Sequence, residues 1–275
     1  MFSLDAYLSR IAYDGPRDAS LEALRALHRC HTAAIPFENL NPLLGWPVGL
    51  DIASLEAKLV RGRRGGWCFE QNTLLCHALE SMGFAVQGRA ARVLWGNVGG
   101  YLGPRSHMVL EVALDGQAWL ADVGFGGVTL TGPLVMAPEI EQATPHETFR
   151  LMEPSPGDYV LEAQLETWLP LYRFRRDEQL LPDYEVSSWY LCTHPDSWFR
   201  RDLAAARSFP GGRVGLRNNV FTVRRTGRAA ETTVLRTAGE IRTVLERDFH
   251  IELPDAPEVE AVLARIAART DSPAI

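Results

Sequence analysis

A cysteine follows two glycines at the position where the sequence predicts a helix to begin. The segment reads Arg64-Gly65-Gly66-Trp67-Cys68, and Cys68 lies in the first turn of the expected helix. Free N–H groups and the helix dipole at a helix N-terminus favour a thiolate over a thiol. A surface dipole contact contributes only about 0.3 to 1 kcal/mol, so a stable thiolate also needs a cationic partner such as a histidine. Cys68 is therefore a candidate nucleophile.

A histidine and an aspartate occur on two segments that the sequence predicts to pair as a hairpin. His107 begins an expected strand, Asp122 lies on the expected strand 119–125, and Asp115-Gly116 between them is a strong signal for a two-residue turn. Such a turn makes His107 and Asp122 diagonal neighbours on one face, about 7 to 8 Å apart at the backbone. An odd-length loop would place them on opposite faces of the sheet.

Cys68, His107 and Asp122 can together be interpreted as nucleophile, base and orienting carboxylate. An aspartate in an apolar strand is costly unless it has a partner, and a histidine in that role becomes oriented and more basic. On the residues alone, another interpretation stays open. Cys68 could be a small core residue, and the His107–Asp122 pair could be an ordinary structural hydrogen bond.

Other polar motifs give only weak indications of a functional site. His28 and His31 have the i,i+3 spacing that could hold a metal, but no further ligand cluster follows, so a packed helix is favoured and no metal is expected. The glycines at 124, 126 and 127 indicate close approach of backbone rather than a phosphate-binding P-loop, which needs a Gly-Lys-Ser/Thr ending.

The elements that would position these residues change in type along the chain. Apolar spacing predicts helices over 4–11, 21–27, 54–60 and 68–82. After Gly83 the period falls to two, which predicts strands over 86–95, 107–114, 119–125, 148–152, 159–165 and 168–174. The remainder predicts a helix over 197–206, strands over 220–225 and 231–235, and two final helices with capping boxes at Thr237/Glu240 and Asp255/Glu258. We therefore expect an α+β protein: a helical bundle (1–84), an antiparallel sheet or barrel (85–186) and a mixed α/β region (187–275).

Composition excludes several classes of protein. The 275 residues are 46% hydrophobic, and 28 Lys and Arg against 34 Asp and Glu give a net charge of −6, which argues against a nucleic-acid partner. No stretch approaches the roughly 18 uncharged apolar residues of a membrane span, and the first ten residues do not resemble a secretion signal. Four cysteines without a CxxC pair predict free thiols and a cytoplasmic location.

The assembled motifs resemble those of the arylamine N-acetyltransferases. The resemblance covers most of residues 1–135 and is carried by four segments in the family's order: Ile35-Pro36-Phe37-Glu38-Asn39-Leu40, Arg64 to Glu70, Ser106-His107, and Asp122-Val123-Gly124-Phe125-Gly126. It implies a helical bundle, a β-barrel and a C-terminal α/β lid, and it implies that the catalytic triad is Cys68, His107 and Asp122.

The resemblance also implies further roles and a reaction. Glu38 and Arg64 would form a structural ion pair, and the substrate pocket would use Phe37, Val93, Ser106 and Phe125. Gly126 and Gly127 would lie near coenzyme A. Acetyl-CoA would be the cosubstrate, and an aromatic amine, hydrazine or hydroxylamine would accept the acetyl group by a ping-pong mechanism through acetyl-cysteine.

Two alternatives are kept at this point. A thiol hydrolase or transglutaminase-like acyl transferase would use the same three side chains, since each begins with attack on an acyl carbon. A binding module with a purely structural thiol is the second alternative. The segment 35–40 and the glycine-phenylalanine run after Asp122 favour the acetyltransferase. The preferred acceptor, the acyl-chain preference and the oligomeric state are left open by the sequence.

Overall fold

Helices form the N-terminal part of the chain, as the 3.6-residue spacing predicts. The computed structural model describes residues 2–96 and 102–270. Its first elements are α1 (Leu4–Arg10), α2 (Leu21–Ala34), the short strand β1 (Phe37–Glu38), α3 (Leu40–Leu44), α4 (Ile52–Leu55), the π-helical turn η1 (Glu56–Arg61) and α5 (Cys68–Ser81). The hydroxyls of Ser3 and Ser20 accept hydrogen bonds from backbone N–H groups and so begin α1 and α2. The helix expected over 54–60 is present as α4 followed by η1.

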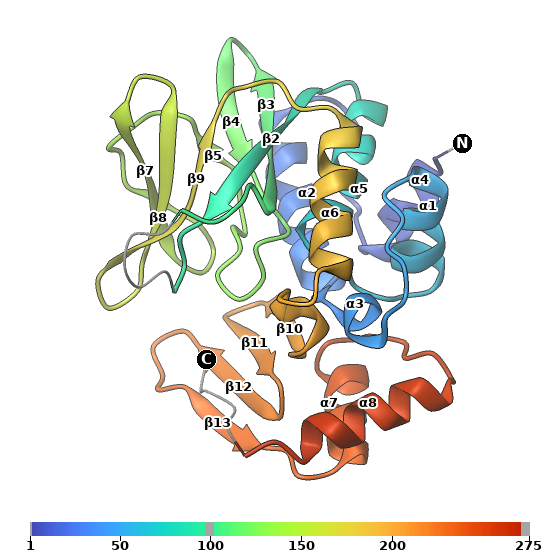
Figure 1. Ribbon diagram of the computed structural model, residues 1–275. Coiled ribbons are helices and arrows are strands. Elements are labelled where there is room, and N and C mark those ends of the chain that lie inside the picture. Colours follow the sequence, from blue (N-terminus) through green and yellow to red (C-terminus); the bar gives the residue numbers. More distant parts are fainter. Residues whose placement is uncertain (1, 97–101, 271–275) are drawn as a thin grey trace.

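The middle of the chain forms a strongly curved antiparallel sheet, a nearly closed barrel (Figure 1). Its strands pair in the order β5-β4-β3-β2-β9-β8-β7-β6. They are β2 (Ala85–Val93), β3 (His107–Leu114), β4 (Gln117–Ala121), β5 (Leu134–Val135), β6 (Gln142–Ala143), β7 (Thr148–Ser155), β8 (Asp158–Gln164) and β9 (Trp168–Arg175). Alternate side chains such as Leu120, Phe149 and Leu161 point inward and form a buried core. The pairing of β2 with β9 joins the two halves of this sheet.

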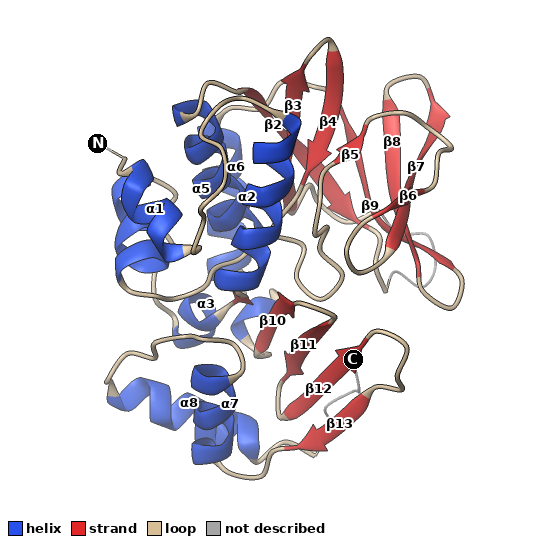
Figure 2. Cartoon of the chain, turned by 180° about the vertical axis from the view of Figure 1, so that it is seen from behind, coloured by secondary structure: helices blue, strands red, loops and turns tan. Residues whose placement is uncertain are grey.

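The C-terminal part forms a second, smaller sheet covered by two helices (Figure 2). Its elements are α6 (Leu181–Thr193), the 3₁₀ turn η2 (Trp198–Arg200), β10 (Ala204–Phe209), β11 (Gly212–Arg217), β12 (Val220–Arg225), β13 (Glu231–Val234), α7 (Ala238–Arg247) and α8 (Pro257–Ala267). The sheet order is β1-β10-β11-β12-β13, so the two-residue strand β1 of the helical part completes this sheet. Leu245, Phe249 and Leu263 belong to its separate core.

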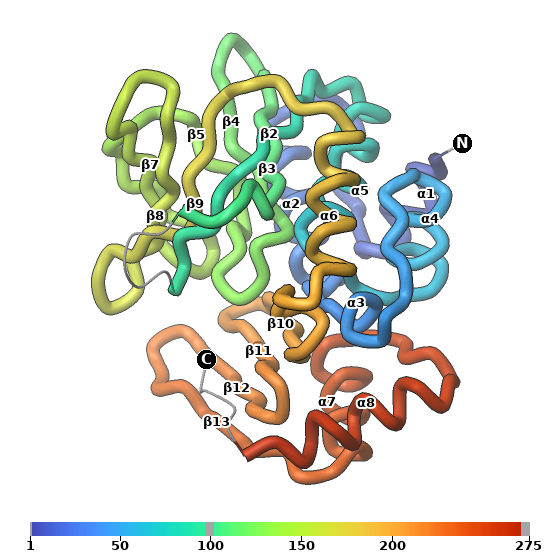
Figure 3. The backbone as a smooth tube through the Cα atoms, in the orientation of Figure 1, coloured from blue at the N-terminus to red at the C-terminus, as the bar shows by residue number. Residues whose placement is uncertain are grey.

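These parts confirm the expected α+β class, with the bundle beside the barrel and the C-terminal sheet below both (Figure 1). The tube trace shows α6 leading along the bundle into η2 and then β10 (Figure 3). Tyr184 of α6 lies against Phe69 of α5, with ring centroids 5.9 Å apart. The proposed boundary at residue 186 therefore falls inside α6, a helix that packs on the bundle. Within the described ranges, no helix is both long and apolar enough to cross a membrane.

Two sequence-based expectations about secondary structure are wrong in the region 181–206. The helix expected over 197–206 is only the short turn η2, after which residues 204–209 form strand β10. The alanines of β10 have high helix propensity, but Ala205 and Ala206 pair with Glu38 and Phe37, and this tertiary pairing decides their conformation. Helix α6, in contrast, was not expected, because its exposed side includes Val186 and Trp189 and its apolar residues do not form one stripe.

Two smaller corrections concern element ends. The strand expected over 119–125 ends at Ala121 as β4, because the chain from Asp122 onward hydrogen-bonds to side chains instead of to β3. Thr237 does begin α7 with the expected capping box to Glu240. Asp255 does not cap α8, which begins after Ala256.

Candidate active site

Cys68 is the first residue of α5 and is brought there by a loop that approaches its neighbours closely. A Cβ at Gly65 would lie 2.2 Å from the Pro36 carbonyl oxygen, so this position requires glycine. The Trp67 N–H donates to Oε2 of Glu70 at 3.2 Å, which satisfies one of the free donors at the start of the helix. Cys68 itself is 6% exposed, and its Sγ–H donates to the Ser106 carbonyl oxygen at 3.6 Å.

His107 and Asp122 meet as the predicted hairpin requires. Asp115 and Gly116 have φ of 51° and 74°, and the turn pairs Leu114 with Gln117, the register expected from the sequence. His107 Nε2 and Asp122 Oδ2 are 2.8 Å apart, and both side chains are buried. The structure therefore brings this pair together, although Asp122 lies one residue beyond the end of β4.

The electrostatics of the pair favour an imidazolium beside the thiol. Burial lowers the pKa of His107, but the charges of Asp122 and Cys68 and hydrogen bonds to both outweigh it and raise that pKa to about 10. Burial also opposes the charge on Asp122, yet His107 and the hydrogen bonds to its carboxylate hold its pKa below the usual value. Such a site can place a protonated imidazole, a proton donor for acyl transfer, beside a cysteine.

The loop after Asp122 lies directly against the start of α5. A Cβ at Gly124 would be 2.5 Å from the Cα of Cys68, so only glycine allows this contact. The Gly124 N–H also donates to Oδ1 of Asp122 at 2.9 Å. Close packing of backbone thus places the carboxylate relative to the nucleophile.

Aromatic rings surround His107 on the barrel side. The Phe125 ring lies edge-on to it at 5.3 Å between centroids, and the Tyr172 ring lies at 4.9 Å. Val93 is half-buried and pairs with Tyr172 across β2 and β9. Tyr172 was not expected at the site, since from the sequence it is one apolar residue of a strand.

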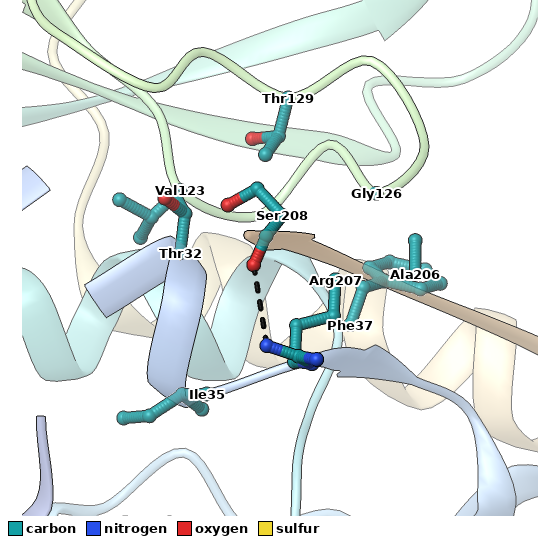
Figure 4. Close-up of a pocket in the computed structure, with 9 residues that line it drawn as sticks. All are labelled: Thr32, Ile35, Phe37, Val123, Gly126, Thr129, Ala206, Arg207 and Ser208. Atoms are coloured by element: carbon teal, nitrogen blue, oxygen red, sulfur yellow. Dashed lines mark hydrogen bonds between the residues drawn. The ribbon is translucent and has the colours of Figure 1, made fainter. Parts of the chain in front are cut away.

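A small cavity lies between the loop after Asp122 and strand β10 (Figure 4). It has room for about one water-sized sphere, roughly 10 Å³. Its lining residues are Thr32, Ile35, Phe37, Val123, Gly126, Thr129, Ala206, Arg207 and Ser208. Two of the residues that we expect at the substrate pocket or near coenzyme A, Phe37 and Gly126, line this cavity. An aromatic ring can enter it only if the lining groups move apart.

The predicted pair of Glu38 and Arg64 is present below the nucleophile loop. Arg64 Nη2 and Glu38 Oε1 are 2.7 Å apart, and both side chains are buried. Glu38 Oε2 accepts from the Leu40 N–H at 2.6 Å. Burial raises the pKa of Glu38, but Arg64 and Lys58 outweigh it, so the carboxyl is held ionised. The pair therefore connects the loop of Cys68 to the segment that contains β1.

The two histidines of α2 make hydrogen bonds inside the bundle. His28 Nε2 accepts from the Asp122 N–H at 3.2 Å. His31 lies between the hydroxyl of Tyr7 and Oε1 of Gln71, at 2.9 and 2.8 Å. Among residues 2–96 and 102–270, no group of three or more His, Cys, Asp or Glu is arranged to hold a metal.

One functional candidate was missed from the sequence. Asn72, fully buried one turn after Cys68, donates to Oδ1 of Asp122 at 2.9 Å and accepts from the Val123 N–H at 3.1 Å. Two features of the sequence could have indicated it. Asn72 is four residues after Cys68, so both lie on one side of the helix, and it belongs to the uninterrupted polar run 70–73.

Known proteins resemble this chain over nearly its whole length. A family model described as N-acetyltransferase matches residues 20–259. The arylamine N-acetyltransferase of Escherichia coli (strain K12) is 39% identical over 255 residues, 92% of this chain and 90% of that protein. The arylamine N-acetyltransferase of Mycolicibacterium smegmatis is 40% identical over 274 residues, 98% of each. The solved structure of Mycobacterium marinum arylamine N-acetyltransferase in complex with CoA has a TM-score of 0.91 at 36% identity, with 96% of this chain and 99% of that chain covered.

Proposed function

Because the chain belongs to the arylamine N-acetyltransferase family, we propose that it transfers an acetyl group from acetyl-CoA to aromatic amines or hydrazines. The observation that carries this proposal is the buried His107–Asp122 hydrogen bond beside Cys68 at the start of α5. N-hydroxyarylamines are a further acceptor class, since a relative from Salmonella typhimurium is named an N-hydroxyarylamine O-acetyltransferase as well.

The first half-reaction acetylates the enzyme. The Cys68 thiolate attacks the thioester carbonyl carbon of acetyl-CoA, a bond forms between Sγ and that carbon, and the bond from the carbon to the CoA sulfur breaks. The imidazolium of His107 gives its proton to the departing CoA thiolate. The enzyme then carries acetyl-Cys68 and a neutral His107 that remains hydrogen-bonded to Asp122.

The second half-reaction uses the neutral imidazole as a base. The nitrogen of the acceptor attacks the acetyl carbon, and His107 takes the proton that this nitrogen loses. The bond to Sγ breaks, so the Cys68 thiolate and the His107 imidazolium are restored. CoA departs before the acceptor binds, and the kinetics are therefore ping-pong.

The residues around the triad have separate roles in this proposal. Phe37, Val93, Ser106 and Phe125 form the acceptor pocket, where an uncharged aromatic amine packs against the rings. Coenzyme A lies near Gly126 and Gly127. A Cβ at Gly127 would have nothing within 4 Å, which leaves space for a ligand at that point of the loop.

The remaining parts of the chain support this site. The Glu38–Arg64 pair is structural, and the α/β region 187–275 acts as a lid that keeps water from the acetyl-enzyme. In this division the bundle (1–84) supplies Cys68 and the barrel (85–186) supplies His107 and Asp122. A cytoplasmic location fits the four free cysteines, which suit a reducing compartment.

Mass spectrometry of the intact protein mixed with acetyl-CoA tests the proposal. We expect an adduct of about 42 Da, an acetyl group in place of the thiol hydrogen, that maps to Cys68 and disappears when an aromatic amine is added. Cys76→Ala is the matched control. Cys76 is on the same helix, and burial raises the pKa of its thiol to about 12, so this variant should still form the adduct. Absence of an adduct on the wild-type protein would contradict the proposal and favour a thiol hydrolase.

A further inference from the structure

We propose that Asn72 is a positioning residue that fixes His107 and Asp122 relative to the helix of Cys68. The inference rests on the proposed function, because it assigns Asn72 a part in acetyl transfer. The hydrogen bonds made by its amide go to Met108, Asp122 and Val123 rather than to the thiol, so we assign it no step of the reaction. It acts through the backbone beside His107 and through the carboxylate of Asp122.

The amide of Asn72 connects α5 to both segments that contribute the other two triad residues. Its Nδ2 donates to the Met108 carbonyl oxygen at 2.7 Å and to Oδ1 of Asp122 at 2.9 Å. Its Oδ1 accepts from the Val123 N–H at 3.1 Å. An asparagine amide has two donor hydrogens and an oxygen that can accept two hydrogen bonds, so both donors and one acceptor site of this side chain are used.

These contacts define where the catalytic groups lie. Met108 follows His107 on β3, so its carbonyl fixes the start of that strand against α5. Asn72 and Cys68 are four residues apart and therefore project from the same side of the helix. One buried side chain thus holds the nucleophile's helix, the histidine's strand and the aspartate's loop at fixed separations.

The hydrogen bonds to Asp122 also determine how its carboxylate faces His107. Oδ1 accepts from Asn72 and from the Gly124 N–H, which leaves Oδ2 directed at His107 Nε2. The other titratable groups that act at this point are His28, which accepts from the Asp122 N–H, and Tyr172, whose pKa is raised by burial and by Asp122. Asn72 differs from His28 and Tyr172 in that it also hydrogen-bonds to the backbone of the strand of His107, at the Met108 carbonyl oxygen.

The neighbouring residue Gln71 provides a matched comparison. It is as completely buried as Asn72 and is also an amide on α5. Its hydrogen bonds go elsewhere, to Nε2 of His31 and to the Gly66 carbonyl oxygen. Loss of either amide should destabilise the fold, but only Asn72 should change the behaviour of His107.

The test compares Asn72→Ala and Gln71→Ala in three measurements. For Asn72→Ala we expect kcat/KM to fall about 10- to 100-fold, the size of one charge-assisted hydrogen bond and a small misplacement. The pH at which His107 loses its proton, followed by NMR of nitrogen-labelled histidine, should fall from about 10 because Asp122 is held less well. Gln71→Ala should lower Tm and leave the titration of His107 as in the wild type.

Asn72→Asp is the second variant, in case the alanine variant does not fold. It keeps the side chain's size and the acceptor for Val123, and it replaces only the donating amide by a carboxylate oxygen that faces Asp122. We expect at least the same loss of kcat/KM at neutral pH. The inference is overturned if the folded variants keep kcat/KM within about twofold of the wild type and His107 titrates unchanged. Absence of acetyl-Cys68 in the wild type would instead contradict the proposed function, while the titration of His107 would still test Asn72.

Discussion

The triad and the attachment of the C-terminal region are both held by polar side chains, but they are built differently. At the triad, Asn72, Gly124 and His107 all bind one carboxylate, so the contacts support one another. The C-terminal region is held at separate points. His146, before β7, contacts the carbonyl oxygens of Phe209 and Gly212 from Nε2 at 2.8 and 2.9 Å.

Further single attachments hold other parts of the same region. Arg213 of β11 donates to the Thr129 carbonyl oxygen at 2.8 Å and forms an ion pair with Glu147. Asn39 accepts from the Ala204 N–H at 2.7 Å through its side-chain oxygen. The Asn39 contact involves other residues than the contacts of His146 and Arg213, so loss of the Arg213 contacts need not remove it. We therefore expect the reactive centre to be held more firmly than the C-terminal region, the proposed lid.

The largest expected effect is a loss of catalysis with little loss of stability. Cys68→Ala should lower kcat/KM by about 10⁴-fold or more, because the nucleophile is lost. The side chain is small, so the unfolding free energy should change by at most a few kcal/mol. Steady-state rates and urea denaturation measure the two effects. A variant that still acetylates amines would contradict the role of the thiol.

Gly124→Ala should disrupt the packing of the loop after Asp122 against Cys68. The new Cβ would lie 2.5 Å from the Cα of Cys68 and 2.9 Å from Nδ2 of Asn72. We expect a loss of about 1 to 3 kcal/mol of stability and about 100-fold in kcat/KM. Gly127→Ala is the control for stability, because its Cβ would meet nothing within 4 Å and should change stability by no more than about 0.5 kcal/mol. Equal stability of the two variants would show that the contact at Gly124 is unimportant for the fold.

Arg213→Met should weaken the attachment of the C-terminal region, the proposed lid, and leave the triad intact. It leaves Glu147 without its partner, and because that carboxylate is only partly buried we expect about 2 to 4 kcal/mol of destabilisation. Hydrolysis of acetyl-CoA without an amine should rise relative to transfer, since water reaches acetyl-Cys68 more easily. Rates of CoA release with and without amine measure this ratio. An unchanged ratio would argue against a protective role for this region.

The smallest expected effect is the change of the unfolding free energy with pH. Its slope is at most about 1.4 kcal/mol per pH unit for each proton bound or released on unfolding. Burial lowers the pKa of His28 to about 4 and of His31 to about 3, so both bind protons only after unfolding. Stability should therefore rise from pH 4 to about 6.5. His107, with a pKa of about 10, binds a proton in the folded state, so its contribution is lost as pH rises from about 6.5 to 10.

Urea denaturation between pH 4 and 10 checks this profile. The histidines together should produce a maximum near pH 6.5. His107→Gln should flatten the decline at high pH and leave the rise at low pH as in the wild type. A decline that persists in this variant would mean that the His107–Asp122 pair does not cause it.

The sequence predicted best those parts that local chemistry decides. The hairpin of His107 and Asp122 followed from Asp115-Gly116, because a two-residue turn determines the register over the whole ladder. The helix start at Cys68 and the capping box at Thr237 are local in the same way. Each could be read from one short continuous segment of the chain.

The parts that distant contacts decide were not predictable in this way. Strand β10 begins with three alanines and an arginine, all good helix formers, and is extended because it pairs with β1 on one side and β11 on the other. The function of Asn72 depends on Met108 and Val123, which the fold brings to it from outside its helix. The cavity of Figure 4 joins residues of α2, β1, the loop after Asp122 and β10, so no single segment indicated it.

The pairing of β1 with β10 has a consequence for biosynthesis. Asn39 and Ala204, beside this pairing, are 165 positions apart in the chain. During translation, all three catalytic residues leave the ribosome well before β10 does, since chains emerge from the N-terminus onward. In the proposed division the region 187–275 is the lid, so the nascent chain lacks that lid for this interval, and a chain that ends before residue 204 would carry Cys68, His107 and Asp122 without strand β10.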